Sequence, residues 1–357
     1  MIKTDRYARQ IVLPEIGEAG QDRLARASVL CVGAGGLGCP ALLYLAAAGV
    51  GRIGVIDADT VDLSNLQRQV LFSTAQVGEN KALAAAERLR HLNPEIQVEA
   101  YPERLTAENS VKLFPAYDLI IDGTDNFSSK FLINDASLAC GVPFIYASIL
   151  GFEGQIGVFG LEDGPCYRCL FPHAPEGDVP TCAQAGVIGA LAGMMGAMQA
   201  MEAVKIIVGH ERFAPLSGKL WTIDARDMAP RVLSLPRSPD CPICHETKEH
   251  IMFGLFQNSS PRVPDLSPVE ARSHSGALFV DVREANEWDA GHIEGAQHFA
   301  LSRLLQGQTP DWPKDREIIL YCAHGQRSLQ AAKILQKQDY TNLSNMAGGY
   351  AAWCSAR

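Results

Sequence analysis

The chain has 357 residues, of which 31 are Lys or Arg and 40 are Asp or Glu, so its formal net charge is −9. Hydrophobic residues make up 47% and charged residues 20%, as in ordinary globular proteins. This length predicts about two domains, each able to bury its own core. The negative charge argues against nonspecific binding to nucleic acid or an acidic membrane, since no overall positive field attracts phosphates.

The cysteines and the apolar segments bear on the location of the protein. Ten cysteines in 357 residues are too few for a small disulfide scaffold. The N-terminal sequence MIKTDRYARQ lacks the apolar run of a secretory signal, so we expect a reducing, cytoplasmic location. The most membrane-like segment, 185–209, contains Gln199, Glu202 and Lys205, which favours a buried helix over a membrane span.

Short apolar runs alternate with helical patterns along the first part of the chain. Residues 28–57 have the pattern of a strand, a helix and a second strand. Such alternation predicts a Rossmann-like, doubly wound α/β sheet that is mostly parallel. The further strand candidates lie at 96–100, 119–122 and 144–147, and helix candidates lie at 81–92 and 127–140.

The composition changes near residue 248, where Pro and Ser gather. We interpret 248–264 as a linker that follows a first domain over 1–247 and precedes a smaller α/β domain over 265–357. In the second domain the strand candidates lie at 277–283, 317–322 and 341–347, with a helix at 327–338.

A glycine-rich loop joins the first strand to its helix. Gly33, Gly35 and Gly38 form the pattern G-x-G-x-x-G, and Gly36 lies within it. In this context glycines allow a tight turn, and the helix N-terminus offers free N–H groups to phosphate. Asp57 ends the second strand, close to the spacing of about 20 residues at which a carboxylate binds a ribose hydroxyl. The loop therefore predicts a nucleotide site.

Cationic and amide side chains follow where a nucleotide would lie. Displacement at an α-phosphate needs several cations, because charge builds up on the phosphate oxygens and on the leaving pyrophosphate. A dehydrogenase needs few, so a nicotinamide-dependent oxidoreductase is only a remote alternative. The residues concerned are Asp59, Ser64, Asn65, Leu66, Gln67, Arg68 and Lys81, with Arg9 near the N-terminus.

Asp125 and Asn126 follow another predicted strand and should also lie at the carboxyl edge of the sheet. The Asp125 carboxylate could hold Mg²⁺ against a triphosphate. An Asp in this position is also often a simple helix cap.

Two C-x₂-C pairs predict a structural zinc site. Cys166 with Cys169, and Cys241 with Cys244, would supply four thiolates to one tetrahedral ion and leave no open catalytic position. His245 in place of Cys244 is a minor alternative. Cys182 belongs to no pair and lies in a polar segment, as either a nucleophile or a buried thiol.

These motifs, RYARQ, VGAGGLG, SNLQRQ, TDN and the paired cysteines, resemble the ubiquitin-activating-like adenylyltransferases that prepare sulfur-carrier proteins. The resemblance implies ATP-dependent adenylation of a carrier's C-terminal glycine. It also implies that Gly36, Asp57, Asn65, Arg68, Lys81 and Asp125 line the ATP–Mg²⁺ site. Arg9 would reach across a homodimer interface, and Cys182 would match a thiol that links covalently to the carrier in some members.

The second domain contains AGHIEGA and a strand that ends in Cys322, followed by Ala-His-Gly-Gln and Arg327, and it resembles the rhodanese sulfurtransferases. A loop that wraps Cys322 would direct N–H groups at its sulfur and, with Arg327, lower the thiol pKa. A phosphatase is disfavoured, because its loop needs five residues between Cys and Arg. Asp281 and Arg283 look like supporting residues, and Trp288 is expected in the core.

The whole chain resembles the molybdopterin-synthase adenylyltransferase/sulfurtransferase fusions. That resemblance implies a ubiquitin-like partner ending in Gly-Gly, a thiocarboxylate product and a persulfide donor such as a cysteine desulfurase or thiosulfate. Thiamine synthesis and tRNA thiolation use similar chemistry, and a noncatalytic scaffold for ubiquitin-like proteins is the other class.

Overall fold

The computed structural model describes residues 4–161, 164–173, 186–257, 263–336 and 338–355. The chain divides into two compact units, Met1–Ser259 and Ser260–Arg357. Each unit is described by itself.

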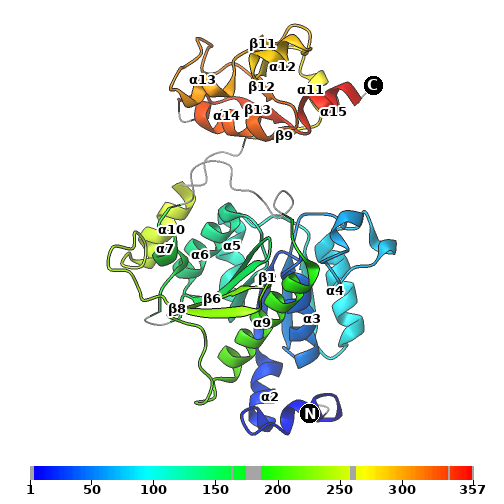
Figure 1. Ribbon diagram of the computed structural model, residues 1–357, viewed down its shortest axis with the longest axis vertical. Coiled ribbons are helices and arrows are strands. Elements are labelled where there is room, and N and C mark those ends of the chain that lie inside the picture. The colour runs from blue at the N-terminus through cyan, green and yellow to red at the C-terminus, as the bar shows by residue number, and fades with distance from the viewer. Residues whose placement is uncertain (1–3, 162–163, 174–185, 258–262, 337, 356–357) are drawn as a thin grey trace. The chain divides into compact units, whose positions relative to one another are not determined.

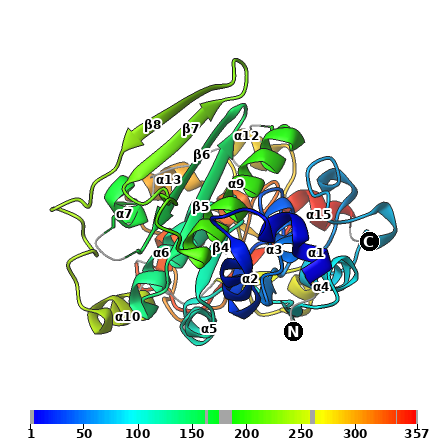
Figure 2. The same ribbon diagram turned by 90° about the horizontal axis from the view of Figure 1, so that it is seen from below.

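The first unit is built on an eight-stranded sheet of order β3-β2-β1-β4-β5-β6-β7-β8 (Figures 1 and 2). The first five strands in this order pair in parallel, and β6, β7 and β8 continue the sheet antiparallel. The strands are β1 (Ser28–Val32), β2 (Arg52–Ile56), β3 (Gln97–Tyr101), β4 (Leu119–Asp122), β5 (Phe144–Leu150), β6 (Glu153–Phe159), β7 (Lys219–Asp224) and β8 (Ala229–Ser234).

Helices cover both faces of this sheet. On one face α4, α3 and α9 pack on the strands. On the other face α6 packs on the strands, and α5 and α10 pack against α6. The helices are α1 (Thr4–Ile11), α2 (Gly17–Arg26), α3 (Gly38–Ala48), α4 (Lys81–Leu92), α5 (Ala107–Leu113), α6 (Phe127–Cys140), α7 (Tyr167–Leu170), α9 (Gly189–Val208) and α10 (Lys248–Gln257), with 3₁₀ turns η1 (Leu63–Asn65), η2 (Thr74–Gln76) and η3 (Phe114–Ala116).

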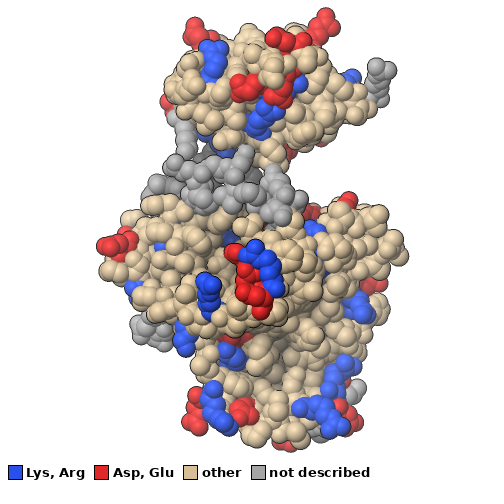
Figure 3. Space-filling model, viewed as in Figure 1, with Lys and Arg blue, Asp and Glu red and all other residues tan. Residues whose placement is uncertain are grey.

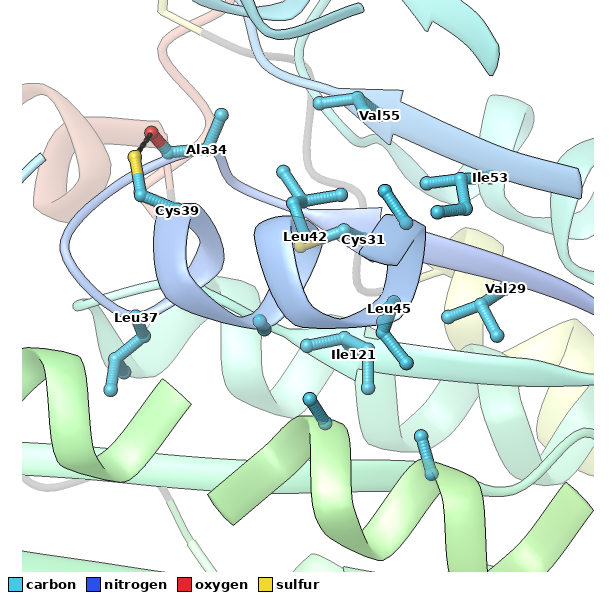
Figure 4. Close-up of a cluster of buried hydrophobic side chains, with 14 of the residues drawn as sticks. Val29, Cys31, Ala34, Leu37, Cys39, Leu42, Leu45, Ile53, Val55 and Ile121 are labelled. Atoms are coloured by element: carbon cyan, nitrogen blue, oxygen red, sulfur yellow. Dashed lines mark hydrogen bonds between the residues drawn. The ribbon is translucent and has the colours of Figure 1, made fainter. Parts of the chain in front are cut away.

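The predicted doubly wound fold is confirmed, and its cause is visible in the strands. Val29 and Cys31 of β1 belong to the apolar core on the α3 face, whereas Leu30 and Val32 belong to the core on the α6 face. Successive side chains of a strand point to opposite faces, so a continuous apolar run is buried only when both faces are covered. Figure 4 shows Leu42 and Leu45 of α3 directed at this strand layer.

The helix ends follow the sequence closely. The side chains of Asn80 and Asn126 accept hydrogen bonds from the first-turn N–H groups of α4 and α6. Gly49 and Gly141 end α3 and α6 in the left-handed conformation, at φ 84° and 70°. The predicted helices 81–92 and 127–140 therefore have the bounds that the structure gives.

The membrane-like segment forms α9, the one described helix whose length and composition would allow it to cross a membrane. It packs against α3 and strands β5 and β6, and half of its most apolar window is buried. Glu202 accepts a hydrogen bond of 2.8 Å from the backbone N–H of Leu216 and pairs with Lys205. These contacts identify α9 as a helix of the protein core, as the sequence predicts.

The expected linker over 248–264 is wrong in its first part. Residues Lys248–Gln257 form α10, which packs on α6, and Ile251 and Leu255 of this helix are buried. Ile251 and Leu255 gain a covering surface there, which outweighs the loop character suggested by the prolines that follow.

The second unit is a five-stranded parallel sheet of order β11-β10-β12-β13-β9. Buried side chains again lie on both faces of the sheet, with α14 packed on β12 and β13. The strands are β9 (Asp265–Leu266), β10 (Leu278–Asp281), β11 (Gln297–His298), β12 (Ile318–Tyr321) and β13 (Leu343–Met346); the helices are α11 (Pro268–Ser273), α12 (Ala285–Asp289), α13 (Leu301–Leu305), α14 (Gln326–Gln336) and α15 (Gly349–Ser355).

Acidic and basic side chains are intermixed on the face of each unit seen in Figure 3. No continuous basic patch is seen among the described residues of that face.

The packing of α9 on α3 predicts opposite effects for two glycines of α9. A Cβ at Gly196 would lie 2.2 Å from the carbonyl oxygen of Leu37, whereas a Cβ at Gly193 meets nothing within 4 Å. We expect Gly196→Ala to lower the free energy of unfolding by about 1–3 kcal/mol through overpacking. Gly193→Ala should leave it unchanged or raise it by up to about 1 kcal/mol. Calorimetric unfolding of the full chain measures both, and equal effects of the two variants would contradict this account.

Candidate active sites

The glycine loop lies at the point where the strand order reverses. In the sheet, β2 and β3 lie on one side of β1, whereas β4 and β5 lie on its other side. The connections that follow β1 and β4 therefore diverge, and the carboxyl ends of these two strands form a crevice. A Cβ at Gly38 would lie 2.0 Å from the carbonyl oxygen of Gly33, and one at Gly123 would lie 2.4 Å from it. Gly33 itself has φ 92°. Only glycine permits this close approach, which leaves a cradle lined by backbone at the start of α3.

Asp57 closes one side of the loop. Its carboxylate accepts hydrogen bonds of 2.8 Å from the backbone N–H groups of Ala34 and Asp59. Burial raises the pKa of Asp57, and these two hydrogen bonds only partly offset that effect. The predicted ribose ligand therefore also ties β2 to the glycine loop, and each oxygen has a further lone pair for a ligand.

Two of the predicted cations lie beside the loop. The Arg68 side chain passes over Gly36, where a Cβ would lie 3.3 Å from Cδ of Arg68. The Lys81 side chain is buried, and its Nζ lies 3.3 Å from a carboxylate oxygen of Asp59. Arg68 thus lies beside the glycine loop, and Lys81 lies beside Asp59, two residues beyond Asp57.

The remaining polar residues of the 59–68 stretch form a turn. Ser64 donates to Asp62 and carries the backbone carbonyl that accepts 3.2 Å from Arg68. Asn65 and Leu66 are half-buried, and Gln67 is exposed. The turn presents this group beside the glycine loop and binds the guanidinium of Arg68.

Helix α9 contacts each of these segments. A Cβ at Gly189 would lie 2.2 Å from the carbonyl oxygen of Gln67, and the methyl group of Ala192 would lie 3.5 Å from a Cβ at Gly36. Further along the same face, the Gln199 amide donates 2.8 Å to the backbone oxygen of Asp122. Helix α9 thus fixes the distances between the glycine loop, the turn that carries Arg68 and the end of β4.

Asp125 and Asn126 have different roles. Asn126 is the N-cap of α6, and its side chain accepts a hydrogen bond of 2.9 Å from the N–H of Ser129. The helix cap is therefore Asn126 and not Asp125. Asp125 is exposed, and no hydrogen bond or ion pair joins it to another described residue. An unengaged carboxylate at this edge suits a divalent cation held with substrate phosphates.

Arg9 lies exposed on α1, away from any described partner, and Cys182 lies outside the described residues. Neither position tests the role that the family resemblance implies.

The four paired cysteines come together. The sulfur atoms of Cys166, Cys169, Cys241 and Cys244 all lie within 4.8 Å of one another, and the Cys169–Cys244 and Cys166–Cys241 distances are 3.4 and 3.6 Å. Four sulfurs at about 2.3 Å from a tetrahedral ion are separated by roughly 3.8 Å. The cluster could therefore hold a metal ion. His245 lies outside it, with its ring nitrogen 3.1 Å from the carbonyl oxygen of Ser238.

In the second unit, Cys322 follows β12 and is only 2% exposed. Its sulfur accepts 3.1 Å from the N–H of Gly325 and 3.5 Å from the hydroxyl of Ser328. Burial opposes ionisation, but these hydrogen bonds, with N–H groups of Ser328 and His324, bring the pKa of Cys322 below that of an ordinary thiol. The predicted thiolate loop is present, and Ser328 is a member that the sequence analysis missed.

Arg327 has a partner that the sequence analysis also missed. Its guanidinium donates two hydrogen bonds of 2.7 Å to the carboxylate of Glu287. Arg327 lowers the pKa of Glu287 to about 2, and the Cys322 sulfur contributes to the raised pKa of Arg327. The charge of Arg327 is therefore balanced by the Glu287 carboxylate. The N–H groups of the loop contribute more to stabilising the thiolate than the sequence analysis expected.

The supporting residues differ from expectation in one case. Arg283 and Asp281 form a buried ion pair of 2.6 Å, as their assignment as supporting residues suggested. Trp288 is half-buried rather than in the core, stacked between His292 and His298 at centroid distances of 3.6 and 5.0 Å. Imidazole rings thus stack on the indole, which is not in the core as the sequence analysis expected.

A phosphate cradle with flanking cations in one unit and a thiolate loop in the other define an enzyme of adenylyl and sulfur transfer. Residues 7–243 match the ThiF family, and residues 266–356 match the rhodanese-like domain. The chain belongs to the ThiF family and carries a C-terminal rhodanese-like domain.

Relatives share both parts. The chain is 40% identical over 363 residues to the probable adenylyltransferase/sulfurtransferase MoeZ of Mycobacterium tuberculosis, which covers 98% of this chain and 92% of the relative. It is 51% identical over 246 residues to the sulfur carrier protein adenylyltransferase of Thermus thermophilus, which covers 67% of this chain and 90% of that protein. The crystal structure of E. coli MccB with ATP matches with a TM-score of 0.56 at 25% identity, over 63% of this chain and 68% of that one.

The hydrogen bond from Ser328 to Cys322 generates a pH prediction. Its removal in Ser328→Ala should raise the pKa of Cys322, because the thiolate loses a donor while remaining buried. The thiolate exists above this pKa, so the acid limb of sulfur transfer and of alkylation by iodoacetamide should move to higher pH. At neutral pH we expect alkylation to slow severalfold. The pH dependence of alkylation measures the change, and an unchanged profile would show that the hydroxyl contributes nothing.

Proposed function

We propose that this enzyme adenylates the C-terminal glycine of a ubiquitin-like sulfur-carrier protein and then converts it to a thiocarboxylate, for molybdopterin cofactor biosynthesis. The observation that carries the proposal is the presence of a cationic glycine loop and a thiolate loop in one chain, matched over nearly its whole length by adenylyltransferase/sulfurtransferases. The same chemistry in thiamine biosynthesis or tRNA thiolation is the alternative.

ATP fits the first site by its cradle and its cations. The glycine loop accepts phosphate without a side chain in the way, Asp57 is placed for the ribose, and Arg68 and Lys81 neutralise the charge of the reacting phosphates. In the proposed reaction the carrier carboxylate attacks the α-phosphate, and the bond to pyrophosphate breaks. The resulting acyl-adenylate has a good leaving group, AMP.

Mg²⁺ would be held by Asp125 together with the phosphates of ATP. When bound, the ion would neutralise charge on the pyrophosphate as it leaves. The chain's own contribution is the position of the Asp125 carboxylate at the end of β4 and the cations on the opposite side of the loop.

The second site supplies the sulfur. A donor such as a cysteine desulfurase or thiosulfate would load Cys322 as a persulfide, whose negative sulfur is stabilised by the loop N–H groups. The terminal sulfur attacks the acyl-adenylate, a C–S bond forms and AMP leaves. A second thiol then cleaves the S–S bond, which releases the thiocarboxylate and leaves Cys322 in a disulfide. Cys182 would be the residue that forms a covalent link with the activated carrier, as the family resemblance implies.

The partners and location follow from the same chemistry. A slender Gly-Gly tail suits a carrier that must reach the glycine loop, and Arg9 on α1 would complete the site of the other subunit in a homodimer. The free cysteines of the described residues agree with a cytoplasmic, reducing location. We expect no membrane and no nucleic-acid partner.

The two half-reactions should separate by mutation. Asp125→Ala should abolish ATP–pyrophosphate exchange with a carrier, a loss of at least about 100-fold, because the nucleotide's metal loses its carboxylate. Its thiosulfate sulfurtransferase activity should stay at the wild-type level. Exchange at the wild-type rate in this variant would remove the carboxylate assignment.

Cys322→Ala should have the converse effect. Exchange should persist, while mass spectrometry of the carrier after incubation with Mg-ATP and thiosulfate should find the adenylate but no thiocarboxylate. Cys354→Ala, which removes an exposed thiol of the same unit, is the matched control and should retain both activities. Full sulfur transfer by Cys322→Ala would refute the persulfide role.

The cysteine cluster should bind one structural zinc. Cys169→Ser should reduce the zinc content measured by elemental mass spectrometry and lower the unfolding temperature of the first unit, because tetrahedral thiolate ligation contributes directly to folding. Rhodanese activity should be unaffected. Unchanged zinc content in this variant, or wild-type protein without zinc, would contradict the assignment.

A further inference from the structure

A buried lysine lies beneath the turn that carries Asp125. Lys130, on α6, is only 3% exposed, and its Nζ donates hydrogen bonds to three oxygens. The acceptors are the carboxylate of Asp122 at 2.8 Å, the carbonyl of Thr124 at 2.9 Å and the carbonyl of Ala147 at 2.8 Å. An ammonium group has three protons, so all of them are engaged. Lys130 therefore has no donor left for a substrate.

Asp122 completes the anchor. It is fully buried at the end of β4, and one carboxylate oxygen accepts 3.0 Å from the N–H and 2.6 Å from the hydroxyl of Thr124. Its other oxygen accepts the hydrogen bond from Lys130. The turn 122–124 is thus fixed through both its N–H and its C=O groups, and Gln199 of α9 holds the backbone oxygen of Asp122 from the other side.

The exposed carboxylate of Asp125 stands between two fixed points. On one side the carbonyl of Thr124 is held by Lys130, and on the other side Asn126 caps α6. No hydrogen bond to a described residue holds the Asp125 side chain itself. The direction in which it leaves the backbone is therefore set by the anchor beneath it.

Stability alone does not account for this ion pair. Two buried charges gain little over an apolar pair of similar volume, because desolvation offsets their attraction. We infer that Lys130 is a positioning residue, which acts through Asp122 and Thr124 to aim Asp125 at the metal of bound Mg-ATP. This inference rests on the proposed adenylation and adds to it a residue that never touches the substrate.

The test uses the full chain and removes the anchor in two ways. Lys130→Met leaves the Asp122 carboxylate buried without its cation, so it is expected to lower the unfolding temperature of the first unit. The double variant Asp122→Asn/Lys130→Met removes both charges, so its unfolding temperature should lie above that of Lys130→Met, although the carbonyls of Thr124 and Ala147 still lose a donor. Lys130→Arg keeps a cation with several donors and should restore function in part.

Two readouts separate positioning from folding. Calorimetric titration with ATP, with Mg²⁺ and with EDTA, gives the gain in affinity that the metal provides. In the double variant we expect this gain to be lost, while affinity without metal stays within about twofold, since the glycine loop and cations are intact. Exchange of pyrophosphate should fall by about 100-fold. Lys205→Met, which breaks the partly buried ion pair with Glu202 on α9, is the matched control and should change neither readout.

The outcomes are distinct. A stable double variant with the wild-type metal-dependent gain and wild-type exchange would overturn the inference, because the anchor would then be structural only. Loss of the gain in a stable double variant, with partial recovery in Lys130→Arg, would support it. If wild-type protein bound Mg-ATP but catalysed no exchange with any carrier, the proposed function would fail, and the binding titration would still decide the role of Lys130.

Discussion

The first unit depends on the contact of three backbone segments at the carboxyl ends of β1 and β4. The oxygen of Gly33 lies where side chains at Gly38 and Gly123 would otherwise be, so the loop, the start of α3 and the end of β4 meet without any side chain between them. This approach leaves N–H groups facing the crevice and brings Asp57, Arg68 and the Asp125 turn to its rim. The described residues around the glycine loop that are proposed for adenylation, Asp57, Arg68 and Asp125, are placed relative to this contact.

Buried groups support the exposed groups in both units. Asp125 is exposed, and its turn rests on a saturated lysine and a buried carboxylate. Cys322 is buried and gains its anionic character from backbone N–H groups and Ser328 rather than from a free cation. In each site the surrounding network determines the direction or the charge of the reactive group.

Much of this arrangement could be predicted from the sequence, because local signals were strong. The apolar runs of β1, β2 and β4, the asparagine caps and the G-x-G-x-x-G loop each encode structure within a few residues. The paired cysteines predicted their own cluster because C-x₂-C spacing restricts where two sulfurs can lie. Strands β6 to β8 were not predicted: β6 directly follows β5 and β8 directly follows β7 in antiparallel pairs, so these pairs lack the strand–helix–strand pattern that marked the parallel strands.

Other features depend on tertiary contacts that no local pattern carries. Lys130 looks like an ordinary surface residue of an amphipathic helix until Ala147 and Asp122 are placed beside it. Glu287 lies 40 residues from Arg327, and only the fold brings the two together. Helix α10 was mistaken for part of a linker because its covering surface on α6 comes from a distant segment. Trp288 was misplaced because its stacking partners are His292, in the loop that follows α12, and His298 of β11.

The small residues of α9 have a consequence for how this enzyme can change. Gly189, Ala192 and Gly196 lie on one face of α9. In this order they contact the turn at Gln67 and Arg68, the glycine loop at Gly36, and the beginning of α3. Any bulkier substitution along this stripe would displace several parts of the pocket at once. Substrate preference can therefore change more easily through substitutions in the exposed turns around the site than through substitutions in α9. The small apolar residues of this helix are required by its close contact with a polar site.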